Sequence, residues 1–139
     1  MRKIKIGNLL VLFVFTIAPA IWTGGAMAQA TTTAQSEAGF AGLQGRWGRT
    51  EGAYTITING VDANGKLDAS YANPDPVPFS KAQATREGSV LKLFFEIQAP
   101  GYNGSTYRLT YGPVKQALTG EYYQAAAQQK FDVYFARMK

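Results

Sequence analysis

Gly45-Arg46-Trp47 is the first strand-like signal after a long stretch without periodicity, and Phe131-Asp132-Val133-Tyr134-Phe135-Ala136-Arg137 is the last one in the chain. A closed antiparallel barrel needs a bulky side chain to fill its narrow end, and a Trp early in the first strand can do this. An Arg late in the last strand can lay its guanidinium across the indole face as a cation–π partner. We therefore expect Trp47 and Arg137 to form a structural pair at the floor of a barrel.

The residues between these two ends show the patterns of short strands separated by turns. Tyr54, Ile56 and Ile58 alternate with threonines, which is the period of two of a half-buried strand. The sequence Asp-Ala-Asn-Gly at 62–65 is typical of a hairpin turn, because Asn-Gly accepts positive φ angles. The full set of expected strands is 45–50, 53–61, 66–71, 79–86, 89–97, 105–111, 117–124 and 131–137.

Eight strands joined by short connections leave no room for a long helix. The sequence therefore predicts an all-β fold, an eight-stranded antiparallel up-and-down barrel over residues 43–139. Ala72–Pro78 contains alternating prolines, which favour a stiff extended loop or a sheet edge. The connection at 125–129 carries no turn residue. A barrel of eight strands encloses a space that side chains fill or that holds one small ligand.

The N-terminal part has the features of an export signal. Arg2, Lys3 and Lys5 precede an apolar run from Leu9 to Ile21, and the small-x-small sequence Ala-Met-Ala ends at position 28. The apolar run is shorter than the roughly 20 residues of a membrane span, and a proline interrupts it. We expect residues 1–28 to be a cleaved signal peptide, residues 29–42 a flexible arm, membrane contact only during export, and a periplasmic or extracellular destination.

Composition argues against several classes of function. Three of the 14 basic residues lie in the expected signal, which leaves 11 against 9 acidic residues and a net charge of +2, so we expect no nucleic-acid partner. The chain has neither Cys nor His, which removes a disulfide framework, the usual general base and the commonest transition-metal ligand. No spaced carboxylate pair is recognisable. We expect no enzyme, no metal and no cofactor.

Gly45-x-Trp47 at the start of an eight-stranded meander, with Arg137 in the last strand, resembles the calycin superfamily of lipocalins, fatty-acid-binding proteins and avidins. The short strands are most similar to the avidin branch, and the pattern also looks like a small exported bacterial family of unknown function. Residues 66–71 resemble the third avidin strand, which ends in a ligand-contacting tyrosine, here Tyr71. The chain departs from avidins in having one Trp after residue 28, and in having Gly48, Arg49 and Ala53 where avidins place polar ligand contacts.

Tyrosine is the conspicuous functional resource, because all eight tyrosines lie after residue 28. A tyrosine offers a flat apolar body and one hydroxyl, which suits a pocket that needs stacking and a hydrogen bond. The alternative for each is a role in core packing or on the outer face. The expected ligand-binding residues are Tyr54, Tyr71, Tyr107 and Tyr122.

Two functions from different classes fit these features. The first is an exported carrier that holds a small, partly apolar ligand at the open end of the barrel. The second is a filled barrel that binds another protein through 29–39 or 72–78, as exported protease inhibitors of this shape do. Val90 and Phe94 lie on the face of their strand opposite the expected core. They could form an exposed apolar patch through which the protein associates as a homo-oligomer, or Phe40 or Leu43 could cover them.

Overall fold

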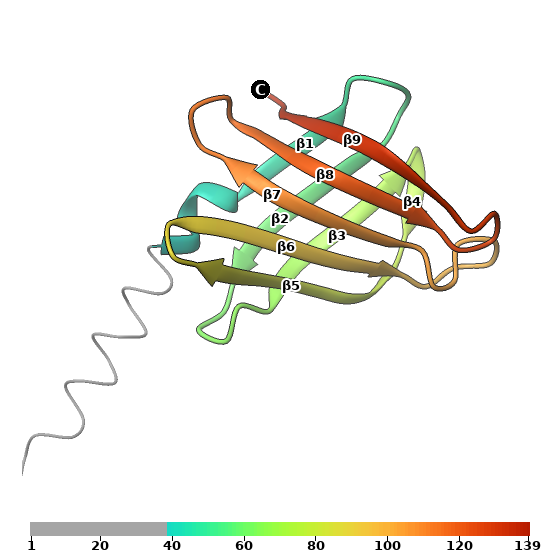
Figure 1. Cartoon of the computed structure of the whole chain (residues 1–139), viewed down its shortest axis with the longest axis horizontal. Helices are drawn as coiled ribbons and strands as arrows, with labels where there is room; N and C mark the ends of the chain where they lie inside the picture. The colour runs from blue at the N-terminus through green and yellow to red at the C-terminus, as the bar shows by residue number, and fades with distance from the viewer. Residues whose placement is uncertain (1–38) are drawn as a thin grey trace, which may run out of the picture.

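The computed structural model describes residues 39–139, in which one antiparallel sheet of nine strands curls into a nearly closed barrel (Figure 1). A single 3₁₀ turn, η1 (Ala41–Leu43), precedes the first strand. The strands are β1 (Gly45–Arg49), β2 (Thr55–Val61), β3 (Leu67–Asn73), β4 (Asp75–Val77), β5 (Phe79–Glu87), β6 (Val90–Ile97), β7 (Thr106–Gly112), β8 (Ala117–Gln124) and β9 (Gln129–Arg137).

The order of the strands confirms the predicted fold class. Consecutive strands pair with each other from β1 to β4, and again from β5 to β9. The first and last strands meet, with Trp47 opposite Arg137, so β4 and β5 are left as the two ends of the sheet. This all-β, antiparallel, nearly closed barrel is consistent with a calycin-like fold.

The predicted number of eight strands is wrong, because the proline-rich stretch contributes the additional strand β4. Its residues pair with the end of β3, Asp75 opposite Asn73 and Val77 opposite Tyr71. Proline cannot donate a ladder hydrogen bond, so a strand with Pro76 at its centre is short and lies at the end of the sheet. The edge that the prolines indicated is present, as a paired strand.

Two turns have backbone conformations that the sequence did not indicate. In the hairpin between β2 and β3, Gly65 has φ +82 and Asn64 has no positive φ, while the Asp62 carboxylate accepts hydrogen bonds from the Asn64 and Lys66 N–H groups. Between β8 and β9, Gln128 takes φ +51. Gln rarely adopts this left-handed conformation, so a sequence without glycine or asparagine at this position gave no indication of the turn.

The expected signal peptide, 1–28, lies outside the described residues, as does most of the expected arm, 29–42. The last residues of that arm are described and belong to the barrel domain, since Phe40 is buried and η1 follows it directly. Residues 39–139 contain no helix with the length and apolarity that a membrane span requires.

Trp47 and Arg137 close one end of the barrel together with η1. The Arg137 guanidinium lies 4.2 Å from the centre of the Trp47 ring, and the indole N–H donates to the Leu43 carbonyl over 2.9 Å. Arg137 also donates to the carbonyls of Gly42 and Gln44 and, over 2.7 Å, to the Gln116 side chain. One guanidinium therefore connects the last strand, the first strand and the segment that precedes it.

Position 45 in the Gly45-x-Trp47 sequence requires glycine for a structural reason. Gly45 has φ +133, and a Cβ at this position would lie 2.5 Å from an Arg137 guanidinium nitrogen. A side chain here would strain the backbone and displace the guanidinium from the indole. The glycine thus leaves space for the Arg137 contact.

Arg137→Leu should lower the free energy of unfolding by about 1–3 kcal/mol, because it removes the cation–π contact and the charged hydrogen bonds to the Gly42 and Gln44 carbonyls. Arg137→Lys keeps the charge but cannot make the planar fork, and should cost less than Arg137→Leu. Urea denaturation followed by Trp47 fluorescence measures both. The matched control is Lys115→Leu on an exposed turn, expected within about 0.5 kcal/mol of the parent. A cost for Arg137→Leu no larger than the control's would contradict this role.

Candidate functional site

The four predicted tyrosines come together at the barrel end opposite Trp47. Tyr71, Tyr107 and Tyr122 point inward from β3, β7 and β8, while Tyr54 comes just before β2 and packs against the core. The Tyr107 ring stacks on the Tyr122 ring at 4.7 Å and meets the Tyr71 ring edge-on at 5.7 Å. We call Tyr54, Tyr71, Tyr107 and Tyr122 the tyrosine cluster.

Tyr71 and Tyr107 form the deep part of the cluster. Their exposed fractions are 2% and 0%, and their hydroxyl oxygens are 3.1 Å apart, so one hydroxyl donates to the other. Burial raises the pKa of Tyr107 to about 12 and raises that of Tyr71 further, which keeps both phenols neutral. In this structure these two side chains are core residues that satisfy each other.

Tyr54 and Tyr122 form the outer part of the cluster, since both side chains are only partly buried. Tyr122 lies between Tyr107 and Phe131, with the Phe131 ring at 6.4 Å and 42% of Phe131 exposed. Burial raises the pKa of Tyr122, and the Ser105 hydroxyl opposes that shift. A molecule that approaches the open end meets Tyr54 and Tyr122 before the deep pair.

Arg49 is a member of this site that the sequence reasoning did not select. Its guanidinium lies 4.5 Å from the centre of the Tyr54 ring, and its positive charge lowers the pKa of Tyr107, against the larger effect of burial. Only 14% of its side chain is exposed. Arg49 follows Trp47 by two residues on the same strand, so the period of two that points Trp47 inward also points Arg49 inward. The inward orientation of Arg49 could therefore have been predicted from this alternation.

The ionic partner of Arg49 is weakly placed. The nearest carboxylate oxygen belongs to Glu51, at 3.5 Å, and the Glu51 side chain is 83% exposed. A pair with one end so exposed is screened by water and contributes little. The site is thus a largely buried cation beside the Tyr54 ring, with one exposed acidic partner.

The barrel interior at the tyrosine cluster is filled in this structure. Within the described part of the chain, Tyr107 and Tyr71 are 0% and 2% exposed, and a hollow of about 160 Å³ beside the site is lined by Arg49 and Glu51 and by none of the four tyrosines. The described residues also contain no buried side-chain N or O atom without a hydrogen-bond partner. A ligand at this end therefore requires movement of at least the outer tyrosines.

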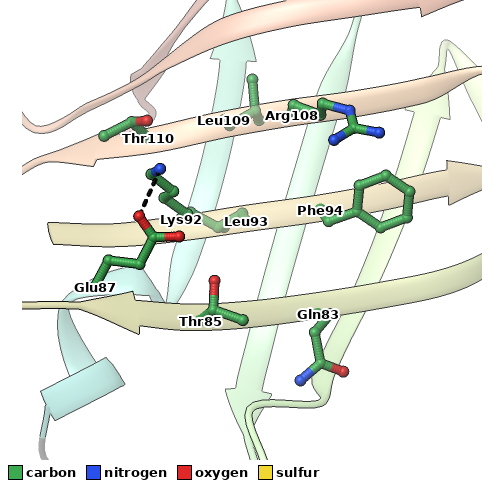
Figure 2. Close-up of a pocket in the computed structure, with 9 residues that line it drawn as sticks. All are labelled: Gln83, Thr85, Glu87, Lys92, Leu93, Phe94, Arg108, Leu109 and Thr110. Carbon is green, nitrogen blue, oxygen red and sulfur yellow. Dashed lines mark ion pairs between the residues drawn. The ribbon is translucent and has the colours of Figure 1, made fainter.

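The predicted apolar patch at Phe94 and Val90 lies on the outer face of the sheet. Val90 is 40% exposed, while the Phe94 ring has Lys81 at 5.7 Å and Arg108 at 5.3 Å, which partly cover it with cations. A hollow of about 390 Å³ lies beside Phe94, with the Lys92–Glu87 ion pair of 2.7 Å at its other side (Figure 2). Phe40 and Leu43, the expected cover, pack into the core instead.

Among residues 39–139, no group of three or more Asp or Glu side chains is placed to hold a metal ion. No protein-family model, curated protein or solved structure matches this chain.

Removing either hydroxyl of the deep pair should destabilise the fold, since the remaining buried hydroxyl loses its partner. We expect Tyr71→Phe and Tyr107→Phe each to cost about 1–2 kcal/mol, and the double variant to cost less than the sum, with a coupling of about 1 kcal/mol. Chemical denaturation of all four proteins measures the cycle. Strict additivity would show that the two hydroxyls do not share a hydrogen bond. Tyr134→Phe on the outer face is the matched control.

The buried phenols should make the fold sensitive to alkali. Tyr107 has a pKa of about 12 in the folded protein against 10 when exposed, so the unfolded chain releases this proton first. Its stabilising contribution is complete below pH 10 and is lost as the pH rises through about 12. The unfolding free energy should fall over this interval, and Tyr107→Phe should reduce the slope. A tyrosinate absorbance titration in which all tyrosines ionise together near pH 10 while the protein stays folded would contradict this.

Proposed function

We propose that this protein is an exported, non-enzymatic binding protein that takes a small, partly apolar molecule with an acidic group at the open end of its calycin-like barrel. The observation that carries the proposal is Arg49, a largely buried guanidinium that lies 4.5 Å from the centre of the Tyr54 ring and has one exposed carboxylate partner, Glu51, at 3.5 Å. A buried cation without full neutralisation favours an anionic ligand that would complete the pair. The aromatic rings beside it would take the apolar body of that ligand.

The outer tyrosines would form the entry to this site. Tyr54 and Tyr122 are partly buried, so their rings can move aside at a lower cost than the fully buried pair below them. The tightly packed Tyr71 and Tyr107 would then serve as the base of the site, with their hydroxyls within the reach of a polar ligand group. The predicted contact role of Tyr71 and Tyr107 requires that their mutual hydrogen bond opens or accepts a third partner.

The proposal of binding without chemistry has support in the sequence. The 139-residue sequence lacks His and Cys, and the site has one cation and neutral phenols with raised pKa values. General acid–base or nucleophilic catalysis at neutral pH needs a group whose proton is exchanged near that pH. Export is proposed from the leader pattern of residues 1–28, and the calycin relationship from the barrel together with Gly45-x-Trp47.

A filled barrel that binds another protein is the second candidate, and a specific observation favours it. The Tyr71 and Tyr107 side chains are 2% and 0% exposed, and their hydroxyls already satisfy each other. A solid interior gives mechanical stability and leaves binding to loops, edges and the outer face. Tyr134, which is 40% exposed, lies on the outer face of β9.

Native mass spectrometry of the protein taken from its own exported fraction tests the proposal. We expect the mass of residues 29–139 plus an increment that disappears on denaturation, because the ligand is held without a covalent bond. Arg49→Leu should lose the increment while retaining the fold. The matched control is Arg46→Leu, on the same strand but on the exposed face.

The contrary result has two parts. A bare mass for the parent, and no shift of the tyrosine ring NMR signals when the small-molecule extract of the same fraction is added back, would overturn the small-ligand proposal. That outcome would favour the filled barrel. A mass that begins at a residue other than Gln29 would contradict the expected cleavage site.

A further inference from the structure

The turn between β7 and β8 projects an apolar side chain into solvent. It consists of residues 113–116, and Val114 within it is 96% exposed. Every other exposed large apolar side chain among residues 39–139 is only 40–42% exposed. Packing within the barrel gives no reason for an aliphatic side chain at this position.

Hydrogen bonds hold this turn in one conformation. Gln116 takes φ +50, and its side-chain amide donates to the Pro113 carbonyl over 2.6 Å and to the Tyr111 hydroxyl over 3.1 Å. Its side-chain carbonyl accepts from the Arg137 guanidinium over 2.7 Å. Because these bonds connect the turn to both β7 and β9, they keep Val114 at the outer tip.

The end of the chain lies beside this turn. The Arg137 N–H donates to the Gln116 carbonyl over 3.1 Å, and the Met138 N–H donates to the Arg46 carbonyl over 2.8 Å. Figure 1 shows the orange turn between β7 and β8 close to the C-terminus. Met138 is 40% exposed. We use the name basic corner for five exposed residues: Arg46, Val114, Lys115, Met138 and Lys139.

The segments that meet at the basic corner contain no acidic residue. Residues 40–50, 109–120 and 133–139 hold five Arg or Lys and no Asp or Glu. Two of the five, Arg49 and Arg137, contact aromatic rings of the barrel. The other three are exposed and make no ion pair in the part of the chain that the structure describes. The corner therefore combines an apolar tip with cations that no acidic side chain neutralises.

This combination matches the chemistry of an anionic lipid surface. Anionic headgroups attract Lys and Arg side chains, and an aliphatic side chain gains by entering the boundary between headgroups and acyl chains. A second copy of this chain would bring the same positive charge to the contact and be repelled. A protein partner would need a pocket shaped for Val114, whereas a fluid bilayer accepts a projection of any shape.

We propose that the basic corner docks the exported protein on a membrane surface rich in anionic lipids, with Val114 inserted among the headgroups. The end of the barrel that Trp47 and Arg137 close would then face the membrane. The tyrosine cluster lies at the opposite end and would stay accessible, so the inference does not depend on the small-ligand proposal. This contact would come in addition to the one expected during export.

Sedimentation with vesicles measures the binding. We expect the exported protein to partition at least about tenfold more strongly onto vesicles of equal phosphatidylglycerol and phosphatidylcholine than onto phosphatidylcholine alone. Arg46→Glu/Lys115→Glu should lower the partition coefficient on the anionic vesicles at least about tenfold. The matched control, Lys81→Glu/Arg108→Glu, changes the net charge equally on the outer face of β5 and β7 and should stay within about threefold of the parent. Circular dichroism checks that each variant is folded.

A fluorescent label separates insertion from attraction by charge alone. The 139-residue sequence has no cysteine, so Val114→Cys carries a single nitrobenzoxadiazole label, whose emission shifts to the blue when it leaves water. We expect this shift on the anionic vesicles. The control is Ala126→Cys, on the exposed turn between β8 and β9 at the open end, and its emission should stay unchanged.

Several results would overturn the proposal. One is equal partition onto the two kinds of vesicle, and another is a control charge reversal that weakens binding as much as Arg46→Glu/Lys115→Glu. Binding without a shift at position 114 also overturns it, because attraction by charge alone would fit an acidic protein surface. A shift at position 126 instead of 114 would show that the opposite end of the barrel meets the membrane.

Discussion

The Arg137 guanidinium is the interaction on which the arrangement of this barrel depends. It lies across the Trp47 ring and hydrogen-bonds to η1 and to the β7–β8 turn, so one side chain joins segments from both ends of the domain. The chain has no cysteine, and no disulfide can perform this task. A planar group with five donors suits it, because several carbonyls must be satisfied at once while the flat face stays on the indole.

Closure of one end leaves the other end to define function. The tyrosine cluster fills that end with rings whose hydroxyls pair internally or lie near solvent, and Arg49 adds a positive charge at low exposure. Packing and binding compete for the same side chains here. A fully satisfied interior gives a stable core, whereas the poorly neutralised Arg49 is the feature that packing alone does not explain.

Particular elements show how far the sequence could be interpreted. The alternation in residues 54–58 and the hairpin signal at 62–65 correctly placed β2 and its turn, because period two and turn chemistry are local properties. The proline stretch hid β4, since pairing on a single side tolerates residues that a central strand excludes. Arg49 was not selected as a site residue, although its parity with Trp47 indicated the interior.

The sequence by itself determined the all-β class, the strand alternation and the residue types at both ends of the barrel, because strand periodicity and turn propensity act over a few neighbouring residues. Only the tertiary structure decided that the Tyr71 and Tyr107 hydroxyls pair across 36 positions of the chain and that the Arg49 guanidinium lies against the Tyr54 ring. Such contacts depend on the register and curvature of the whole sheet, which no local pattern encodes.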